Sequence, residues 1–220
     1  MKNIIIIGAS GHAKVIVDVI EKQSLYKISG FVDSGRAQTE LVSGYYILGT
    51  EADIPTLIKA HSIEGFIIAI GDNSVRSMVA CRIKEINPQA EFISAIHPYA
   101  IIGKDVRIGE GTVIMAGAII NPCSNVGSFC IVNTKASLDH DSSMGDFSSL
   151  APGVTIGGNC RIGEFSAVGI GAAVKHGVKI GAHSIIGGAS MVMQDVEPFT
   201  VNYGIPCKKI RTRAKGEKYL

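Results

Sequence analysis

The segment SLDHDSSMGD (137–146) places one histidine between two acidic residues. His140 is flanked by Asp139 and Asp141 in a stretch with few other charges. An imidazole paired with a carboxylate is a stronger general base, which acyl transfer to an amine or a hydroxyl group requires. A solvated histidine at a polar corner would show the same pattern, and the spacing does not tell which aspartate orients the ring.

A second candidate site lies in the glycine-containing turn GASGHA (8–13), which follows an apolar run and opens a helical stretch. Glycines there permit close backbone approach, and a helix N-terminus attracts phosphate. Asp33, with Ser34 beside it, ends the next strand and is placed to accept hydrogen bonds from a ribose or a base. The turn contributes the candidate substrate-binding residues Gly8, Ser10, Gly11 and His12.

The segment AIGDNSVR (69–76) ends another predicted parallel strand. Ligands bind at the carboxyl ends of such strands, so Gly71, Asn73 and Arg76 are predicted to line the same pocket. An ordinary strand–helix turn with a polar cap would also fit. Some 90 residues are short for a complete dinucleotide fold, which favours a nucleotide diphosphate over NAD.

Residues 1–90 alternate between strand-like and helix-like patterns. Strands are expected at 4–7, 28–32, 45–50 and 65–71, and helices at 13–22, 54–61 and 74–86. This alternation predicts a small Rossmann-like α/β domain of three or four parallel strands.

From Ile96 to Val192, every sixth residue is aliphatic or methionine, at seventeen consecutive positions. The residue two places earlier is always small or compact, so strand alternation directs both side chains inward. Glycine follows the aliphatic residue at nine of the seventeen places, where we expect positive φ at a corner. Three such hexads per turn predict a triangular parallel β-helix over residues 91–195, followed by a basic tail over 196–220.

Because one turn of the predicted coil takes 18 residues, residues that are 18 apart in the sequence should lie one above the other. His140 and His176 stand in one corner column, two turns and roughly 9.6 Å apart, which is too far to pair. We therefore expect His176 to be an exposed surface histidine.

Composition narrows the class of protein. The chain has 220 residues, a net charge of +2 and 18% charged residues, which argues against a nucleic-acid partner. Its five cysteines are widely spaced and form no metal-ligand pattern, so we expect a reduced protein without a metal site. No apolar run is long enough for a membrane span or a signal segment, which predicts a cytoplasmic protein.

The order of these motifs, with VNTKASLDHDSSMGDFSSLAPG (132–153) and YGIPCKKI (203–210), resembles the bacterial nucleotide-sugar acetyltransferases. These include the bacillosamine-type (UDP-4-amino-sugar) and perosamine-type N-acetyltransferases and the related sialic acid O-acetyltransferases. The resemblance implies a left-handed coil, a homotrimer, acetyl-CoA in the cleft between neighbouring coils, and a nucleotide-diphosphate amino sugar on the N-terminal domain.

The resemblance also assigns roles to residues. It makes His140 the general base and Asp141 its orienting acid. Ser149 stands where several relatives have a second histidine. The cofactor-binding residues that it implies are Asn133, Ser149, Gly158, Ile170, Gly188, Pro206 and Lys208.

The expected activity is acetylation of the 4-amino group of a nucleotide-linked amino-deoxy sugar. O-acetylation of a free sugar acid such as sialic acid is the alternative within enzymes. A non-catalytic scaffold or carbohydrate-binding trimer would retain the same coil.

Overall fold

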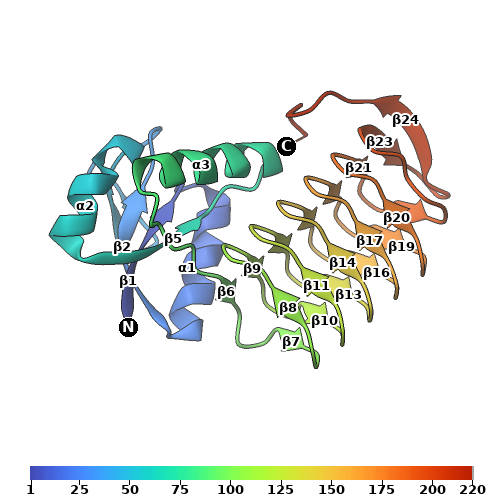
Figure 1. Ribbon diagram of the computed structural model, residues 1–220, viewed down its shortest axis with the longest axis horizontal. Helices are drawn as coiled ribbons and strands as arrows, with labels where there is room; N and C mark the ends of the chain where they lie inside the picture. Colours follow the sequence, from blue (N-terminus) through green and yellow to red (C-terminus); the bar gives the residue numbers. More distant parts are fainter. Residues whose placement is uncertain (220) are drawn as a thin grey trace.

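The computed structural model describes residues 1–219, which form an α/β domain followed by a long coil of short strands (Figure 1). The α/β domain contains six longer elements and a hairpin. Its elements are β1 (Lys2–Ile7), α1 (Gly11–Gln23), β2 (Tyr26–Val32), β3 (Leu41–Val42), β4 (Tyr45–Gly49), the 3₁₀ turn η1 (Glu51–Asp53), α2 (Ile54–His61), β5 (Ile63–Ile68) and α3 (Asn73–Ile86).

The sheet of this domain has the order β3-β4-β2-β1-β5. The pairs among β1, β2, β4 and β5 are parallel, but β3 and β4 form an antiparallel hairpin. The expected sheet of three or four parallel strands is therefore corrected to five strands of mixed direction. Turn residues Ser43 and Gly44, both at positive φ, allow the tight reversal that adds the extra strand.

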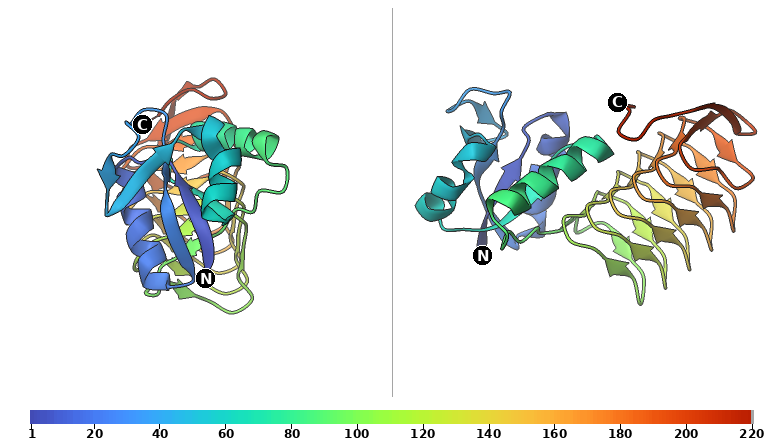
Figure 2. Two further views of the ribbon diagram at one scale, coloured as in Figure 1. Left: turned by 90° about the vertical axis from the view of Figure 1, so that its left-hand side faces the viewer. Right: turned by 45° about the horizontal axis from the view of Figure 1, so that its top comes forward.

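The central strand β1 is apolar because both of its faces are covered. Ile4 and Ile6 pack with α1, whereas Ile5 and Ile7 pack with α2 and α3. The α1 side is shared with the coil, since Ala95 and Met115 belong to the same apolar cluster. The two parts of the chain thus share one continuous core, and Figure 2 shows the α/β domain seated against the first coils.

The coil consists of seventeen two-residue strands, each ending at one of the seventeen aliphatic positions. The strands are β6 (Ala95–Ile96), β7 (Ile101–Ile102), β8 (Arg107–Ile108), β9 (Val113–Ile114), β10 (Ile119–Ile120), β11 (Asn125–Val126), β12 (Ile131–Val132), β13 (Ser137–Leu138), β14 (Ser143–Met144), β15 (Ser149–Leu150), β16 (Thr155–Ile156), β17 (Arg161–Ile162), β18 (Ala167–Val168), β19 (Ala173–Val174), β20 (Lys179–Ile180), β21 (Ile185–Ile186) and β22 (Met191–Val192).

These strands form the three faces of a parallel β-helix. One face carries β7, β10, β13, β16, β19 and β22, a second carries β8, β11, β14, β17 and β20, and the third carries β6, β9, β12, β15, β18 and β21. Each strand pairs with the one 18 residues later, as Ile119 does with Ser137. The interior holds the aliphatic positions and their small partners, including Leu138 and Ala136, as the sequence predicts.

The glycines that follow the aliphatic positions have a different role from the one expected. Positive φ occurs two residues later instead, for example at Cys123 (61°) and Lys135 (58°). A side chain at Gly145 would place its Cβ 2.6 Å from the backbone nitrogen of Glu164 on the next coil. These glycines are therefore needed for close approach between successive coils and not for the left-handed conformation.

One corner of the prism carries a column of stacked rings. Phe129, Phe147, Phe165, His183 and Phe199 follow one another with ring centroids 4.7–5.2 Å apart. Phe92, beside β5, meets Phe129 edge to face at 4.9 Å. The column therefore links the α/β domain to the far end of the coil.

Arg76 of α3 joins the two parts of the chain. Its guanidinium is 1% exposed and donates to the carbonyl oxygens of Phe129, Phe147, Ile70 and Gly71 and to the Asn73 side chain, at 2.7–3.2 Å. Burial lowers the pKa of Arg76 to about 10, so the side chain is still charged at neutral pH. All five of its N–H groups have acceptors, which makes this buried charge tolerable.

The residues after the coil form an ordered cap. β23 (Thr200–Tyr203) pairs in parallel with β21, and β24 (Lys208–Thr212) returns antiparallel to β23. The last described residues then run back toward α3 (Figure 1). No helix within residues 1–219 is both long and apolar enough to cross a lipid bilayer.

Replacing Arg76 by methionine is expected to lower the free energy of unfolding by about 3 kcal/mol or more, because several buried carbonyl groups lose their donor. Arg161→Met, at an exposed position on β17, is the matched control and is expected to cost no more than about 0.5 kcal/mol. Urea denaturation of both variants measures the difference. Equal stability of the two variants would show that Arg76 does not hold the domains together.

Candidate active site

His140 and Asp141 form a hydrogen-bonded pair at the corner between β13 and β14. The imidazole Nδ1 lies 2.7 Å from the carboxylate Oδ2, and the two side chains are 49% and 54% exposed. Asp141 occupies the positive-φ position of this corner, as Cys123 does one coil earlier. The hydrogen bond that Nδ1–H of His140 donates to Asp141 raises the pKa of His140 above its usual value, as expected for a more basic imidazole.

Asp139, the other flanking acid, is engaged elsewhere. Its Oδ1 accepts from the Asn121 side chain at 2.6 Å and from the backbone N–H of His140 at 2.8 Å. The bond from Asn121 is the main reason why the pKa of Asp139 is lowered. Asp139 thus fixes the corner, and Asp141 is the acid that contacts the ring.

The His140 ring lies over Gly158 on the next coil. A Cβ at that position would be 2.7 Å from Nε2 of His140, so the ring occupies the space that a side chain would need. His176, one coil further on, has its ring centroid 6.4 Å from that of His140. The rings are therefore closer than the roughly 9.6 Å expected for two turns of the coil, because they approach each other across Gly158.

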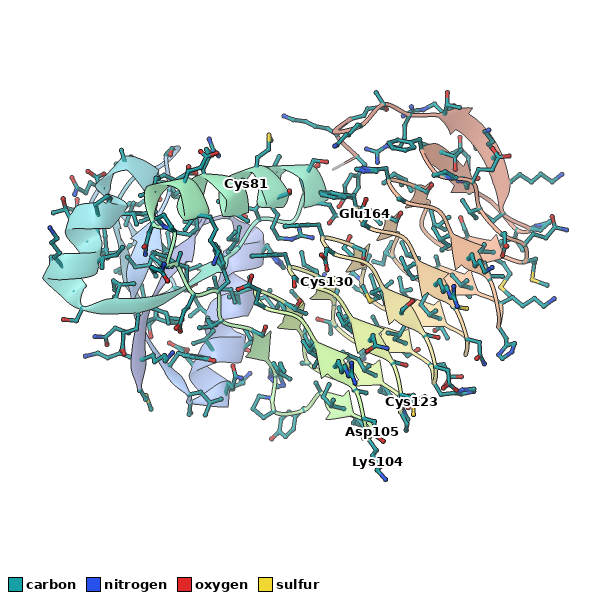
Figure 3. The ribbon with its side chains drawn as sticks, in the orientation of Figure 1. Cys81, Lys104, Asp105, Cys123, Cys130 and Glu164 are labelled. Carbon is teal, nitrogen blue, oxygen red and sulfur yellow. The ribbon has the colours of Figure 1, made fainter. Side chains whose placement is uncertain are left out.

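The corner column that carries Asp141 contains an exposed cysteine. Cys123 and Asp105 precede Asp141 at 18-residue steps, and Figure 3 labels both at one edge of the coil. Cys130, in contrast, is fully buried in the interior. A thiol therefore lies one coil from the His140–Asp141 pair, which the local sequence around His140 did not indicate.

A groove of about 510 Å³ runs along the outer side of the sheet that contains β12, β15, β18 and β21. Its walls are mainly apolar over most of its length. Residues predicted for both substrates line this one groove, namely His12, Gly71, Asn133, Ser149, Ile170 and Gly188. The tertiary structure thus joins two groups of residues that the sequence placed in separate sites.

A second cavity, of about 420 Å³, lies at the carboxyl ends of β1, β2 and β5. Gly8, Ser10, Asp33, Ser34 and Gly71 line it, as predicted for a nucleotide pocket. Asp33 accepts from the backbone N–H groups of Ala9 at 2.7 Å and Gly35 at 2.8 Å, so it shapes the glycine turn. No atom lies within 4 Å of a Cβ built at Gly11, which leaves room at the start of α1.

The two cavities meet at Gly71, which lines both. Next to this junction, Nε2 of His12 is buried and has no hydrogen-bond partner within residues 1–219. Burial, with a contribution from Arg76, lowers the pKa of His12 to about 4, so its imidazole is neutral at physiological pH. An unpaired buried nitrogen beside a cavity is a ready partner for a polar ligand group.

The expectation that Asn73 and Arg76 line the nucleotide pocket is wrong. Both side chains are 1% exposed, and Asn73 donates to the carbonyl oxygens of Phe165 and Ser166 at 3.3 and 3.2 Å. Their polar groups are used in joining α3 to the coil. Asp72 is the helix cap that the alternative interpretation allowed, since it accepts from Ser74 and Val75.

Three residues expected to bind the cofactor lie outside the groove of this chain. Gly158 is under His140 at another corner, Pro206 is in the turn between β23 and β24, and Lys208 begins β24. Lys208 and Lys209 line a small cavity at the capped end of the coil.

Sequence reasoning missed several residues of these cavities. Arg82 and Glu51 form a salt bridge of 3.1 Å at the nucleotide-type cavity, and Tyr219 lines the groove. Arg82 lies six residues beyond Arg76, about 240° around α3, so it is on another face of the helix, which it shares with the cavity residues Val75 and Val79. Tyr219 carries no local signal, because only the return of the C-terminal segment brings it to the groove.

Comparison with known proteins agrees with this geometry. The family described as the PglD N-terminal domain matches residues 3–83. UDP-N-acetylbacillosamine N-acetyltransferase of Bacillus subtilis (strain 168) is 38% identical over 116 residues, which cover 53% of this chain and 52% of that protein. The match thus spans about half the length of this curated relative.

Solved structures match over almost the whole chain. A histidine-to-alanine mutant of GDP-perosamine N-acetyltransferase from Caulobacter crescentus, in complex with CoA and GDP-perosamine, is 32% identical, with a TM-score of 0.90 over 96% of this chain and 98% of that one. The acetyltransferase domain of PglB from Neisseria gonorrhoeae, in complex with acetyl coenzyme A, is 28% identical, with a TM-score of 0.87 over 95% and 99%.

The fold is that of the hexapeptide-repeat acyltransferases, with an α/β domain in front of the coil. The chain belongs to the PglD-type family of nucleotide-sugar N-acetyltransferases, which includes bacillosamine and perosamine N-acetyltransferases. The family resemblance and the fold class predicted from the sequence are both confirmed.

Replacing Asp141 by asparagine is expected to lower the pKa of His140, because the hydrogen bond to the carboxylate is the main cause of its raised value. A base must be neutral to act, so kcat/KM should rise with pH through this pKa. The acidic limb of the pH profile should therefore move to lower pH in Asp141→Asn.

NMR titration of the His140 ring together with the pH profile of kcat/KM measures both effects. Asp139→Asn is the matched control, with a smaller expected shift because Asp139 acts on the ring only through its charge. An unchanged pKa of His140 in Asp141→Asn would contradict the assignment of Asp141 as its partner.

Proposed function

We propose that this protein transfers the acetyl group of acetyl-CoA to the 4-amino group of a nucleotide-linked amino-deoxy sugar. The observation that carries the proposal is the His140–Asp141 pair, with Nδ1 held by the carboxylate at 2.7 Å and the opposite edge of the ring turned toward the next coil. The relatives named above support the substrate class, since one was solved with CoA and GDP-perosamine and another with acetyl coenzyme A.

In the proposed reaction, the neutral sugar amine attacks the thioester carbonyl carbon while Nε2 of His140 accepts its proton. The C–N bond forms, the carbonyl oxygen becomes an oxyanion, and the C–S bond then breaks. The CoA thiolate leaves and takes the proton back from the imidazolium. Asp141 stabilises the imidazolium formed between these steps.

A backbone N–H near the ring would stabilise the oxyanion. The amide of Gly158 lies next to His140, and within the described chain it donates to no protein acceptor. A preorganised donor of this kind typically contributes about 10²–10³ in kcat. Gly158 is therefore proposed as the oxyanion donor, in addition to the CoA contact that the resemblance implies.

We further propose that the working form is a homotrimer whose sites combine residues of two copies. His140 stands at the corner between the other two faces of the prism, whereas the groove runs along the face that contains β15. One chain therefore cannot bring its own His140 to its own groove. In the proposed assembly, acetyl-CoA lies between coils, and the base of one copy serves the nucleotide sugar of the next.

Transfer is proposed to be direct, without an acetyl-enzyme. His140→Ala should lower kcat by about 10²–10⁴ while acetyl-CoA binding changes little, because the ring acts on the amine proton and not on the donor. Steady-state assays with detection of free thiol give kcat, and calorimetry gives the affinity.

Cys123→Ala is the control for this prediction, since Cys123 lies one coil from the pair and could carry an acetyl group in a two-step route. We expect its turnover to be close to that of the wild type. Near-normal turnover of His140→Ala would remove His140 from the mechanism, and inactivity of Cys123→Ala would favour the acetyl-cysteine route.

The cavity at the ends of β1, β2 and β5 is proposed to bind the nucleotide diphosphate. UDP, GDP or dTDP at about 100 times its Kd should stabilise the protein by about 2.7 kcal/mol, or a few degrees in Tm. Gly11→Asp should abolish this protection without unfolding the chain, because the added carboxylate enters open space and repels the diphosphate.

Gly11→Asn has the same shape without the charge and should retain most of the protection. Differential scanning fluorimetry of the three proteins with each nucleotide measures these shifts. If no nucleotide protects the wild type, the acceptor is a free sugar, and O-acetylation of a sugar acid becomes the better function.

A further inference from the structure

The C-terminal segment brings a tyrosine to the junction of the two cavities. Tyr219 lines the groove, and its hydroxyl is 3.5 Å from the carbonyl oxygen of Gly71, the residue that both cavities share. Ser149 on β15 lines the same groove as Tyr219. Tyr219 thus contacts the α/β domain at Gly71 and lines a groove whose other walls are formed by the coil.

This placement is imposed by a network of charged side chains. Glu217 forms an ion pair with Arg211 at 2.6 Å and accepts from the backbone N–H of Ala214 at 3.0 Å. Arg213 donates to the carbonyl oxygens of Glu217 and His183, and its guanidinium lies 5.8 Å from the Tyr219 ring centroid. Arg211 to Glu217 therefore form a fixed turn, here called the C-terminal clamp.

The groove is mainly apolar but includes several polar side chains. Besides Tyr219, the groove is lined by the polar side chains of Asn133, Ser149 and His12, and Nε2 of His12 is buried with no partner within residues 1–219. Burial raises the pKa of Tyr219, so its hydroxyl stays protonated at neutral pH. Its proton points at the Gly71 carbonyl across a long 3.5 Å, so a ligand oxygen at an ordinary distance can replace that acceptor.

We propose that Tyr219 is a positioning residue for the acceptor sugar, donating a hydrogen bond to an oxygen of the sugar ring or its substituents. This inference rests on the proposed function. With the nucleotide in the cavity at β1, β2 and β5 and the donor along the apolar groove, the sugar must lie where the two cavities meet. A phenol held at that point by the C-terminal clamp fixes the sugar before the amine reaches the thioester.

Tyr219→Phe keeps the ring and removes only the hydroxyl. We expect the KM for the nucleotide sugar to rise about three- to tenfold, as for the loss of one hydrogen bond, with an unchanged KM for acetyl-CoA and an unchanged Tm. Tyr46→Phe is the matched control, since Tyr46 is exposed on β4. Its kinetic constants should equal those of the wild type.

Glu217→Gln tests the clamp without touching the groove. This substitution weakens the ion pair with Arg211. It should raise the KM for the nucleotide sugar, by a smaller factor than Tyr219→Phe does. A purely structural role for the segment predicts a lower Tm and no selective change in the KM for the sugar. That result, or a Tyr219→Phe variant with a normal KM for the sugar, would overturn the proposal.

Binding measurements separate this proposal from the proposed function. GDP-perosamine, dTDP-4-amino-4,6-dideoxyglucose and a UDP-4-amino sugar are titrated by calorimetry beside the free nucleotides. If the wild type acetylates none of them, the proposed function fails. The tyrosine proposal is still supported if an amino-sugar nucleotide binds more tightly than the free nucleotide and Tyr219→Phe removes this gain in affinity. It is overturned if the wild type shows no such gain, or if the gain persists in Tyr219→Phe.

Discussion

The pairing of each strand with the one 18 residues later is the constraint on which the other features depend. Because Ile119 pairs with Ser137 and the same register repeats along the coil, every corner residue has a fixed neighbour above and below it. The small interior residues and the glycines at the corners allow this repeat by keeping successive backbones close. The His140 ring over Gly158 is a consequence of this register, as is the stacked column of rings at another corner.

The second requirement is that the α/β domain be held rigidly against the coil. Arg76 achieves this by giving all five N–H groups to acceptors on α3, on the turn before it and on the coil. The cost of burying the charge is offset only because every donor is satisfied. Arg76 also fixes the junction of the two cavities at Gly71, because two of its acceptors are the carbonyl oxygens of Ile70 and Gly71.

Electrostatics distinguishes the polar groups of the two sites. His140 is half exposed beside a carboxylate, which raises its pKa, whereas His12 is buried near a guanidinium, and its pKa falls to about 4. One histidine is thus suited to accept a proton, and the other to remain neutral and make hydrogen bonds. The same residue type gains two chemical properties from two environments within one chain.

The sequence by itself determined the α/β domain, the seventeen short strands, the inward pairs and the corner position of His140, because these depend on local periodicity. It did not determine the mixed sheet, the reason for the corner glycines, or the burial of Asn73 and Arg76. The hairpin that makes the sheet mixed is a local turn at Ser43 and Gly44, which the alternation of strand and helix patterns does not reveal. The other two features depend on contacts between segments far apart in the chain. Spacing left Asp139 and Asp141 equivalent, the resemblance assigned Asp141, and the structure shows Asp141 in contact with the ring. Tertiary structure alone joined the two cavities at Gly71 and brought Tyr219 to them, since each requires a backbone path that sequence spacing does not encode.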